Sequence, residues 1–376
     1  MNEDRAARYQ RLRRRASIIA VLWSALLLSG LILSGWHVAL RDTAERIAPL
    51  TPVLGFVVLL SLIHEAGSLP LAFYGGFLLE HRYGLSSETL GTWLGDQAKA
   101  FGVGLALAGP AASLVYWCIR MSPGRWWLSS GLIFALLILA LTNLAPVLLL
   151  PIFYSVKPLD RDELRARLLA LADRAGARVL GAYEWGLGAK TRKANAALTG
   201  LGRTRRILVS DTMLAQYSDD EIEVVLAHEL AHHVHGDIWK GIALESALVV
   251  AGFYLASRVL DAFAATAGLR GVNDVAGLPL LLLAAGVVSF VMVPVAHAVS
   301  RAFERRADRF ALDLTRNPAA FISAMKRLGA QNLAEEHPSR VVQWLFYSHP
   351  PLAERIAAGQ GVLDCTPDSG LSVEGS

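Results

Sequence analysis

Long and nearly uncharged apolar segments constrain the fold of this chain more than any other feature. A helix needs about 20 mostly apolar residues to cross a bilayer. Six segments meet this requirement, and they cover residues 17–40, 52–79, 101–119, 126–154, 241–263 and 278–299. Because lipid offers the backbone no hydrogen-bond partner, such segments must be helical. The sequence therefore predicts a mainly α, polytopic α-helical membrane protein with about six spans.

The composition and the charge distribution agree with a membrane protein. Hydrophobic residues make up 54% of the 376 residues, which is more than soluble proteins contain. Six arginines precede the first segment, and they are Arg5, Arg8, Arg11, Arg13, Arg14 and Arg15. That segment is too long for a signal peptide and lacks a clear cleavage site, so we expect an uncleaved span with a cytoplasmic N-terminus. Flanking charges of this kind account for the net charge of +4, and no nucleic-acid partner is expected.

The spans divide the chain into two domains and a tail. Residues 1–156 form a predicted N-terminal membrane domain with four spans, which return the chain to the cytoplasmic side. Residues 157–363 form a second domain that contains the last two spans, and the polar tail 364–376 is expected to be disordered. In the soluble part we expect a helix near residues 160–175. The short apolar runs 194–198 and 206–210 predict a β-hairpin.

One pentapeptide, His228-Glu229-Leu230-Ala231-His232, carries the chemistry. Ser218 and Glu221 form a capping box ahead of it, which predicts that the motif lies on a helix. Positions i and i+4 share a helix face, so both imidazoles can bind one zinc ion, while Glu229 can act as general base toward water. The alternative is a capped helix whose histidines are ordinary polar residues. The pair His64-Glu65 is followed by Ser68 rather than histidine and cannot form the same site.

A catalytic zinc also needs a third protein ligand. Glu304 is the best candidate, and Asp308 lies on the same helix face, where it can accept the ring N–H of His228. The alternative for this arginine-rich stretch is a charged helix surface. Two spans separate His232 from Glu304, so both lie on the same side of the membrane.

Other residues are less decisive. Glu65 and Glu245 fall within apolar spans, where ionisable groups either line an aqueous interior or lie near an interface. Cys118 and Cys365 are far apart and have no metal-type spacing, so neither a disulfide nor a thiolate zinc site is expected.

Several motifs together resemble the type I CAAX prenyl endopeptidases, which are integral-membrane gluzincin zinc proteases. The resemblance runs from about Leu59 to Ile356 and rests on five segments. These are Leu69–Tyr74 with the following Glu80 and Arg82–Ser86, then Pro151–Tyr154, His228–His232, Ser300–Asp308 and Ser348–Pro351 with Arg355.

The resemblance implies a large internal chamber with the zinc site at its cytoplasmic end. It implies one Zn²⁺ held by His228, His232 and Glu304, with Glu229 as the general base. It further places His349 near the substrate carbonyl, where it can stabilise the oxyanion, and Arg355 in the same region. Asn195 and Ala196 match the edge strand along which such proteases align their substrates. On the residues alone, Asn195 is a turn residue and His349-Pro350 is a helix-start signal.

The expected function is therefore that of a membrane zinc metalloendopeptidase, similar to enzymes that remove the C-terminal tripeptide of prenylated proteins. Its expected partners are the lipid bilayer and peptide or protein substrates, including lipidated or membrane-bound ones. The composition, rich in Ala, Leu and Arg, suggests a bacterial inner membrane protein. One alternative is a membrane-protein quality-control protease of the heat-shock type. Another is a transporter or lipid-binding protein with a structural zinc, completed by His233, His235 or His349.

Overall fold

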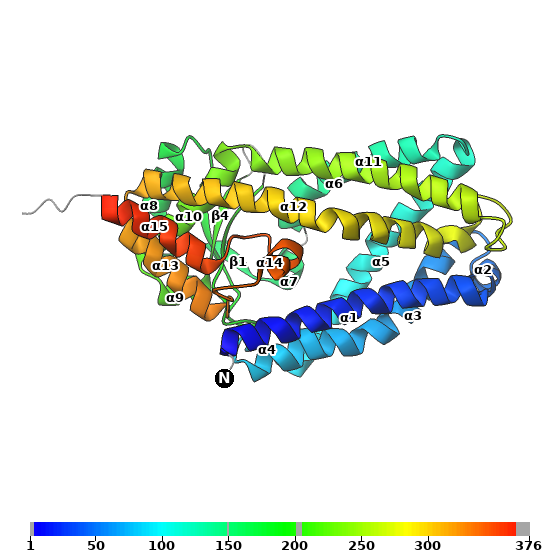
Figure 1. Ribbon diagram of the computed structural model, residues 1–376, viewed down its shortest axis with the longest axis horizontal. Helices are drawn as coiled ribbons and strands as arrows, with labels where there is room; N and C mark the ends of the chain where they lie inside the picture. The colour runs from blue at the N-terminus through cyan, green and yellow to red at the C-terminus, as the bar shows by residue number, and fades with distance from the viewer. Residues whose placement is uncertain (1–3, 149, 201–204, 366–376) are drawn as a thin grey trace, which may run out of the picture.

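The computed structural model describes residues 4–148, 150–200 and 205–365. Long helices form an elongated bundle, and a compact part that combines helices with a small sheet lies at one end of it (Figure 1). The first described residues lie close to this compact part (Figure 1). The bundle thus has one end next to the sheet and another end far from it.

Six long helices correspond to the six predicted spans. They are α1 (Arg5–Ser34), α3 (Pro52–Ala72), α5 (Leu90–Met121), α6 (Trp126–Leu148), α11 (Asp237–Phe263) and α12 (Leu278–Thr315). Among the described residues, five helices are long and apolar enough to cross a membrane, and α6 adds a shorter apolar stretch, Trp126–Thr142. The mainly helical, polytopic fold is therefore confirmed.

Several helix ends differ from the predicted boundaries. The segment predicted to run from 17 to 40 breaks at Gly35, whose φ of 77° ends α1 and begins α2 (Trp36–Ile47). Glycine adopts this left-handed conformation without the penalty of a Cβ atom. The second segment continues from α3 through a π-helix, η1 (Phe73–Leu78), into α4 (Leu79–Arg82). Helix α12 continues past residue 299 to Thr315, and this extension carries Glu304.

A four-stranded mixed sheet lies in the compact part, with strand order β1-β2-β4-β3. The strands are β1 (Val156–Pro158), β2 (Ala182–Trp185), β3 (Ala196–Thr199) and β4 (Arg206–Ser210). The predicted hairpin is confirmed, because β3 pairs antiparallel with β4, although part of its connection, 201–204, lies outside the described residues. β1 and β2, of three and four residues, were not predicted. β3 forms one edge of the sheet.

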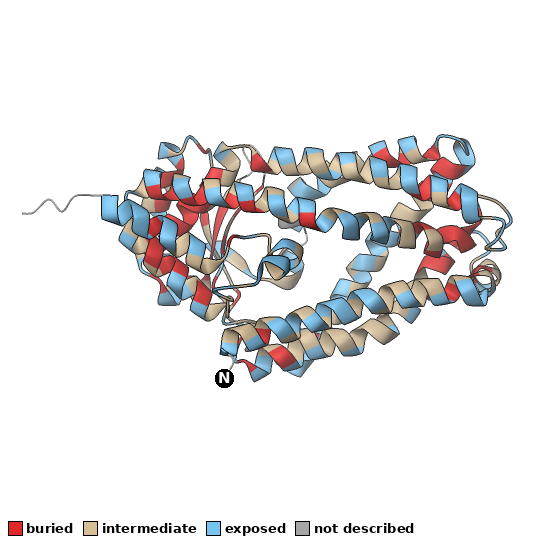
Figure 2. Cartoon of the chain, viewed as in Figure 1, coloured by how far each residue is buried: buried red, intermediate tan, exposed pale blue. Residues whose placement is uncertain are grey.

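Helices cover the sheet and complete the compact part. They are α7 (Leu150–Phe153), α8 (Asp162–Arg174), α9 (Asp211–Gln216), α10 (Asp219–Val234), α13 (Pro318–Gln331), α14 (Arg340–Phe346) and α15 (Leu352–Cys365). One apolar core joins Leu168 of α8 and Leu226 of α10 to Ile207 of β4, and Figure 2 shows buried residues gathered here. Helix α15 reaches Cys365, so the first two residues of the predicted tail are helical, and 366–376 lie outside the described residues.

Two adjoining cavities lie between the long helices. Their volumes are about 500 and 700 Å³, and both are lined by Leu60, Ser61, Ala108 and Leu282. His64 and Glu65 line the first cavity, and Glu245 lines the second. We call the two adjoining cavities together the chamber, and the acidic residues Glu65 and Glu245 are among the residues that line it.

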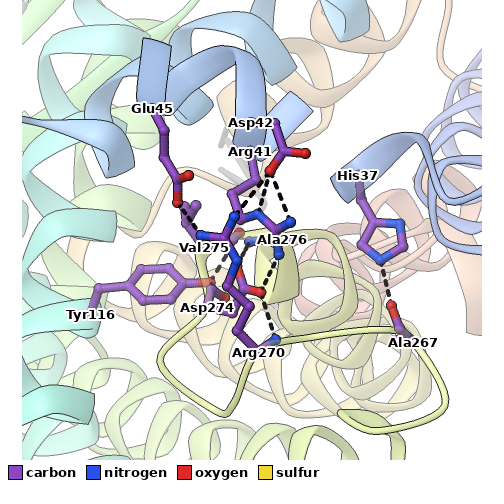
Figure 3. A network of polar contacts seen from close by, with 10 residues as sticks. All are labelled: His37, Arg41, Asp42, Glu45, Tyr116, Ala267, Arg270, Asp274, Val275 and Ala276. Atoms are coloured by element: carbon purple, nitrogen blue, oxygen red, sulfur yellow. Dashed lines mark hydrogen bonds and ion pairs between the residues drawn. The ribbon is translucent and has the colours of Figure 1, made fainter. Parts of the chain in front are cut away.

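A polar network fixes the end of the bundle that lies far from the sheet (Figure 3). The guanidinium of Arg41 on α2 lies 2.7 Å from the carboxylate of Asp274, and both side chains are buried. Asp274 precedes the short 3₁₀ helix η3 (Val275–Gly277), which leads into α12. Tyr116 of α5 donates to the Asp274 carbonyl at 3.2 Å. The network thus joins α2 and α5 to the connection between α11 and α12.

Candidate metal centre

Helix α10 is fixed at its start before it presents any ligand. The Ser218 hydroxyl accepts from the Glu221 N–H at 3.2 Å, and the Glu221 carboxylate accepts from the Ser218 N–H at 2.8 Å, so the predicted capping box forms. Ile222 and Leu226 then bury one face of the helix. Two turns further on, His228 and His232 share a helix face with each other, and the centroids of their rings are 5.1 Å apart.

Helix α12 packs against α10 and brings a carboxylate to both histidines. Nε2 of His228 lies 3.1 Å from Oε2 of Glu304, and Nε2 of His232 lies 3.5 Å from Oε1. One ligand atom from each of these residues lies within 4.8 Å of the other two. Glu304 is only 6% exposed, so its charge needs a nearby positive partner. The predicted His-His-Glu set therefore converges on one point.

The donor set fits a catalytic zinc ion. Oε2 of Glu304 is buried and has no hydrogen-bond partner among the described residues, although His228 Nε2 is 3.1 Å away, as expected for two atoms directed at a common metal. Two imidazoles and one carboxylate are a known set for catalytic zinc, which keeps its fourth position open. Among the described residues, this is the one such group of three. His233 and His235 instead lie against the carbonyls of Leu198 and Ala231, at 3.2 and 2.8 Å.

The ring of His228 has support on its far side. Nδ1 lies 2.9 Å from Oδ1 of Asp308, and the Asp308 side chain is 4% exposed. Arg355 from α15 donates to both oxygens of this carboxylate, at 2.9 and 2.6 Å, and its Nη2 is 3.3 Å from His228 Nδ1. When Nδ1 carries the proton and donates it to Asp308, Nε2 is left to bind a metal.

The electrostatics favour a proton on the histidines of the metal-free site. Burial alone lowers the pKa of His228, but the carboxylates of Asp308 and Glu304 outweigh burial and raise that pKa to about 9. Burial also lowers the pKa of His232, and here Glu304 reverses the direction and raises it above its ordinary value. Burial raises the pKa of Glu229, which favours the acid form of a half-buried carboxyl group.

Of the other predicted residues, His349 lies beside the metal ligands, whereas Asn195 and Ala196 belong to the edge of the sheet. His349 Nε2 is 3.3 Å from Oε1 of Glu304, and its side chain is 58% exposed, so it faces accessible space. Asn195 precedes the edge strand β3, and both its backbone groups contact Ser210: its N–H donates to the hydroxyl at 3.0 Å and its carbonyl accepts from the N–H at 2.9 Å. Ala196 is the first residue of β3 and lies opposite Val209.

One residue at the centre was not predicted from the sequence. Asp237 places Oδ2 3.2 Å from Nδ1 of His232, and it is 6% exposed. The one indication of Asp237 in the sequence is its position directly after the zinc motif, in the stretch that runs from His232 through His235 to Gly236-Asp237. Asp237 comes five residues after the ligand His232, and a helix break lies between them. The i, i+4 spacing of residues on one helix face therefore does not point to Asp237.

Comparison with known proteins places this centre in a family. Residues 158–362 match the family described as peptidase family M48, which is more than half of the chain. The chain belongs to peptidase family M48. Residues 2–155 match the description "CAAX prenyl protease N-terminal, five membrane helices". The His228-His232-Glu304 set is thus the zinc-binding triad of an M48 metallopeptidase in an integral multi-pass membrane protein.

Relatives of this M48 peptidase cover most of its length. A Bacillus subtilis protein described as the uncharacterized metalloprotease YhfN is 32% identical over 93% of this chain and 84% of its own. The CAAX prenyl protease 1 of Saccharomyces cerevisiae is 28% identical over 86% of this chain and 77% of its own. The crystal structure of S. mikatae Ste24p has a TM-score of 0.85 at 24% identity, and it covers 94% of this chain and 88% of that one. The fold is therefore Ste24-like, and the predicted family is confirmed.

Proposed function

We propose that this M48 peptidase cleaves peptide segments of membrane-associated proteins that it takes up through its chamber, as a CAAX-type prenyl endopeptidase. The observation that carries the proposal is that helices α11 and α12 both line the chamber and contribute residues to the metal centre. Ala296 lines the larger cavity and precedes Glu304 by eight residues on α12, while Glu245 lines it eight residues after Asp237 on α11. Eight helical residues rise about 12 Å. A segment of a few residues can therefore reach from the cavity to the ligands.

The side chains around the metal have distinct proposed roles in hydrolysis. Zinc, when bound, supplies a Lewis acid that polarises the scissile carbonyl and activates water. Glu229 takes the proton of the attacking water and passes it to the leaving amine. His349 donates to the oxygen that gains negative charge. Asp308 and Arg355 keep the ring of His228 in the orientation that it needs.

We propose that the substrate aligns along β3. Ser210 occupies both backbone groups of Asn195, and strand alternation then turns the N–H and C=O of Ala196 toward the open edge. An extended peptide can add to the sheet at that position. His233 already contacts the Leu198 carbonyl, which restricts pairing further along the strand. Such a short pairing region suits a substrate that offers only a few residues.

We also propose that the metal centre faces the cytoplasm. The arginine-rich start of α1 contacts the compact part of the molecule. Arg14 lies 2.7 Å from Glu335, and Gln10 donates to the Leu333 carbonyl at 2.7 Å. The N-terminus and the metal centre therefore belong to one side of the membrane. Positive charge next to a first span favours the cytoplasmic side.

Digestion of defined substrates by the purified full chain tests the proposal. A farnesylated CAAX peptide, the same peptide without the lipid, and an unfolded membrane protein are incubated with and without a chelator, and the products are mapped by mass spectrometry. We expect chelator-sensitive release of the last three residues, faster from the farnesylated peptide. Glu304→Ala should show neither the cleavage nor full zinc occupancy. Scattered cleavage of the unfolded protein alone would instead support quality control, and no cleavage of any substrate would overturn the proposal.

A further inference from the structure

The second ligating imidazole, His232, also has a carboxylate behind it. We propose that Asp237 is a positioning residue that orients His232 for the metal, and that Arg306 holds Asp237 in place. Nδ1 of His232 lies 3.2 Å from Oδ2 of Asp237, while Nε2 of the same ring lies 3.5 Å from Oε1 of Glu304. A proton on Nδ1 that is donated to Asp237 leaves Nε2 free to bind the metal.

The turn between α10 and α11 places this carboxylate. Helix α10 ends at Val234, and Gly236 adopts a φ of 66° before α11 begins at Asp237. The left-handed glycine reverses the chain tightly enough for the first residue of α11 to contact a ring five residues earlier. Among the described residues, none beyond its own neighbours in the chain would crowd a side chain at Gly236, so its backbone conformation, rather than lack of space, favours glycine there.

The charge of Asp237 is compensated from a second helix. Its side chain is 5% exposed, and an unpaired carboxylate is costly in that environment. Arg306 of α12 donates to Oδ1, the oxygen that does not face His232, and the Lys240 ammonium lies 3.5 Å from the same atom. Since the positive groups occupy Oδ1, Oδ2 stays directed at the imidazole.

The two imidazoles thus have equivalent supports. Asp308 contacts His228 and is held by Arg355, while Asp237 contacts His232 and is held by Arg306. Helix α12 supplies Arg306 to one pair and Asp308 to the other, and it also carries Glu304 between the two histidines. A shift of α12 therefore changes one ligand and both supports together.

Metal binding by Asp237→Asn tests the role of Asp237. Asp219→Asn is a matched control, because Asp219 is likewise the first residue of its helix, α10, and pairs with an arginine, Arg161. Zinc affinity of the purified full chain is measured by competition with a chromophoric chelator, and cobalt(II) replaces zinc to report ligand geometry in the visible spectrum. Loss of a supporting carboxylate weakens metal affinity about 10- to 100-fold, so we expect this loss and an altered spectrum in Asp237→Asn. Asp219→Asn should retain wild-type affinity and spectrum.

Wild-type zinc affinity and cobalt spectrum in Asp237→Asn would overturn the proposal. If that variant lacks the helical circular dichroism of the wild type, Asp237→Glu replaces it, since it keeps the charge but displaces the carboxylate by one methylene. A loss of affinity in Asp237→Glu supports the proposal, and wild-type affinity contradicts it. Arg306→Gln should produce a smaller loss than Asp237→Asn, and unchanged affinity there would refute the part assigned to Arg306. None of these measurements depends on the substrate or on cleavage.

Discussion

Glu229 is the residue whose proposed role is most directly separable from metal binding. It lies between the two ligating histidines on α10, but it is not one of the three converging ligands. We expect Glu229→Gln to retain stoichiometric zinc and to lose about 10²- to 10⁴-fold in cleavage rate, which is the usual contribution of a general base. Zinc analysis and peptide cleavage on the same sample measure both quantities. Glu223→Gln, on the same helix, should cleave normally, and normal turnover by Glu229→Gln would refute its role.

The protonation of His228 predicts how zinc binding depends on pH. The carboxylates of Asp308 and Glu304 raise its pKa to about 9 in the metal-free protein, and only the neutral ring binds a metal. Each metal ion bound below that pH must therefore displace a proton. We expect zinc affinity to rise by about tenfold per pH unit for each proton released, and to level off above about pH 9. Chelator competition at several pH values measures the slope.

A flat profile between about pH 7 and pH 9 would contradict the protonated state of His228. Asp308→Asn provides an internal comparison, because it removes one of the two carboxylates that raise this pKa. Its slope should flatten at a lower pH than that of the wild type. Asp219→Asn leaves the surroundings of His228 unchanged, so its profile should follow the wild type.

At the scale of the element, the capping box in the first turn of α10 stabilises this helix. Ser218→Ala removes one half of the capping box, and loss of such a cap costs about 1 kcal/mol of folding free energy. We expect a lower thermal unfolding temperature with unchanged zinc stoichiometry, measured by circular dichroism and metal analysis. Ser339→Ala is the control, since Ser339 caps α14, a seven-residue helix with no buried residue. An equal or larger loss in Ser339→Ala would contradict the importance assigned to the α10 cap.

Local patterns made α10, the hairpin and the metal ligands predictable from the sequence. One helix contains the capping box, the apolar spacing and the i, i+4 histidines. The helical period of about 3.6 residues therefore describes all of them. Glu304 and Asp308 share a second helix, and the even number of intervening spans places it on the correct side of the membrane. The β3–β4 pairing followed from two short apolar runs. Apart from the span count that relates Glu304 to the histidines, each of these predictions needed only neighbours along the chain.

Features that depend on helix breaks or on distant contacts were not predictable in the same way. The break at Gly35 lies inside a continuous apolar run, where hydropathy carries no signal for it. Asp237 contacts His232 across the turn at Gly236, so helical spacing does not connect them. Arg355 meets Asp308 from a segment 47 residues away, and its place was suggested only by the family resemblance. Contacts of this kind become visible only when helices pack.

At the scale of the whole molecule, the chamber and the metal centre share helices α11 and α12. The two cavities meet at Leu60, Ser61, Ala108 and Leu282, which come from α3, α5 and α12. The polar network around Arg41 and Asp274 fixes the far end of the same helices. A substrate segment that uses both cavities must therefore pass this junction before it reaches Glu304.

A bulky side chain at the junction tests whether the chamber contributes to cleavage. Ala108→Trp places an indole ring where the two cavities meet, whereas Ala106→Trp changes a residue on the same helix that is exposed and is not among those that line either cavity. Since an indole and a bound segment cannot occupy one space, we expect Ala108→Trp to slow cleavage of a farnesylated membrane-bound peptide at least about tenfold. Zinc content and cleavage of a short soluble peptide should remain at wild-type levels, because the metal centre lies outside the blocked region. Ala106→Trp should cleave both peptides normally. Equal rates for the two variants on the farnesylated peptide would show that the substrate reaches the zinc by a path outside the chamber.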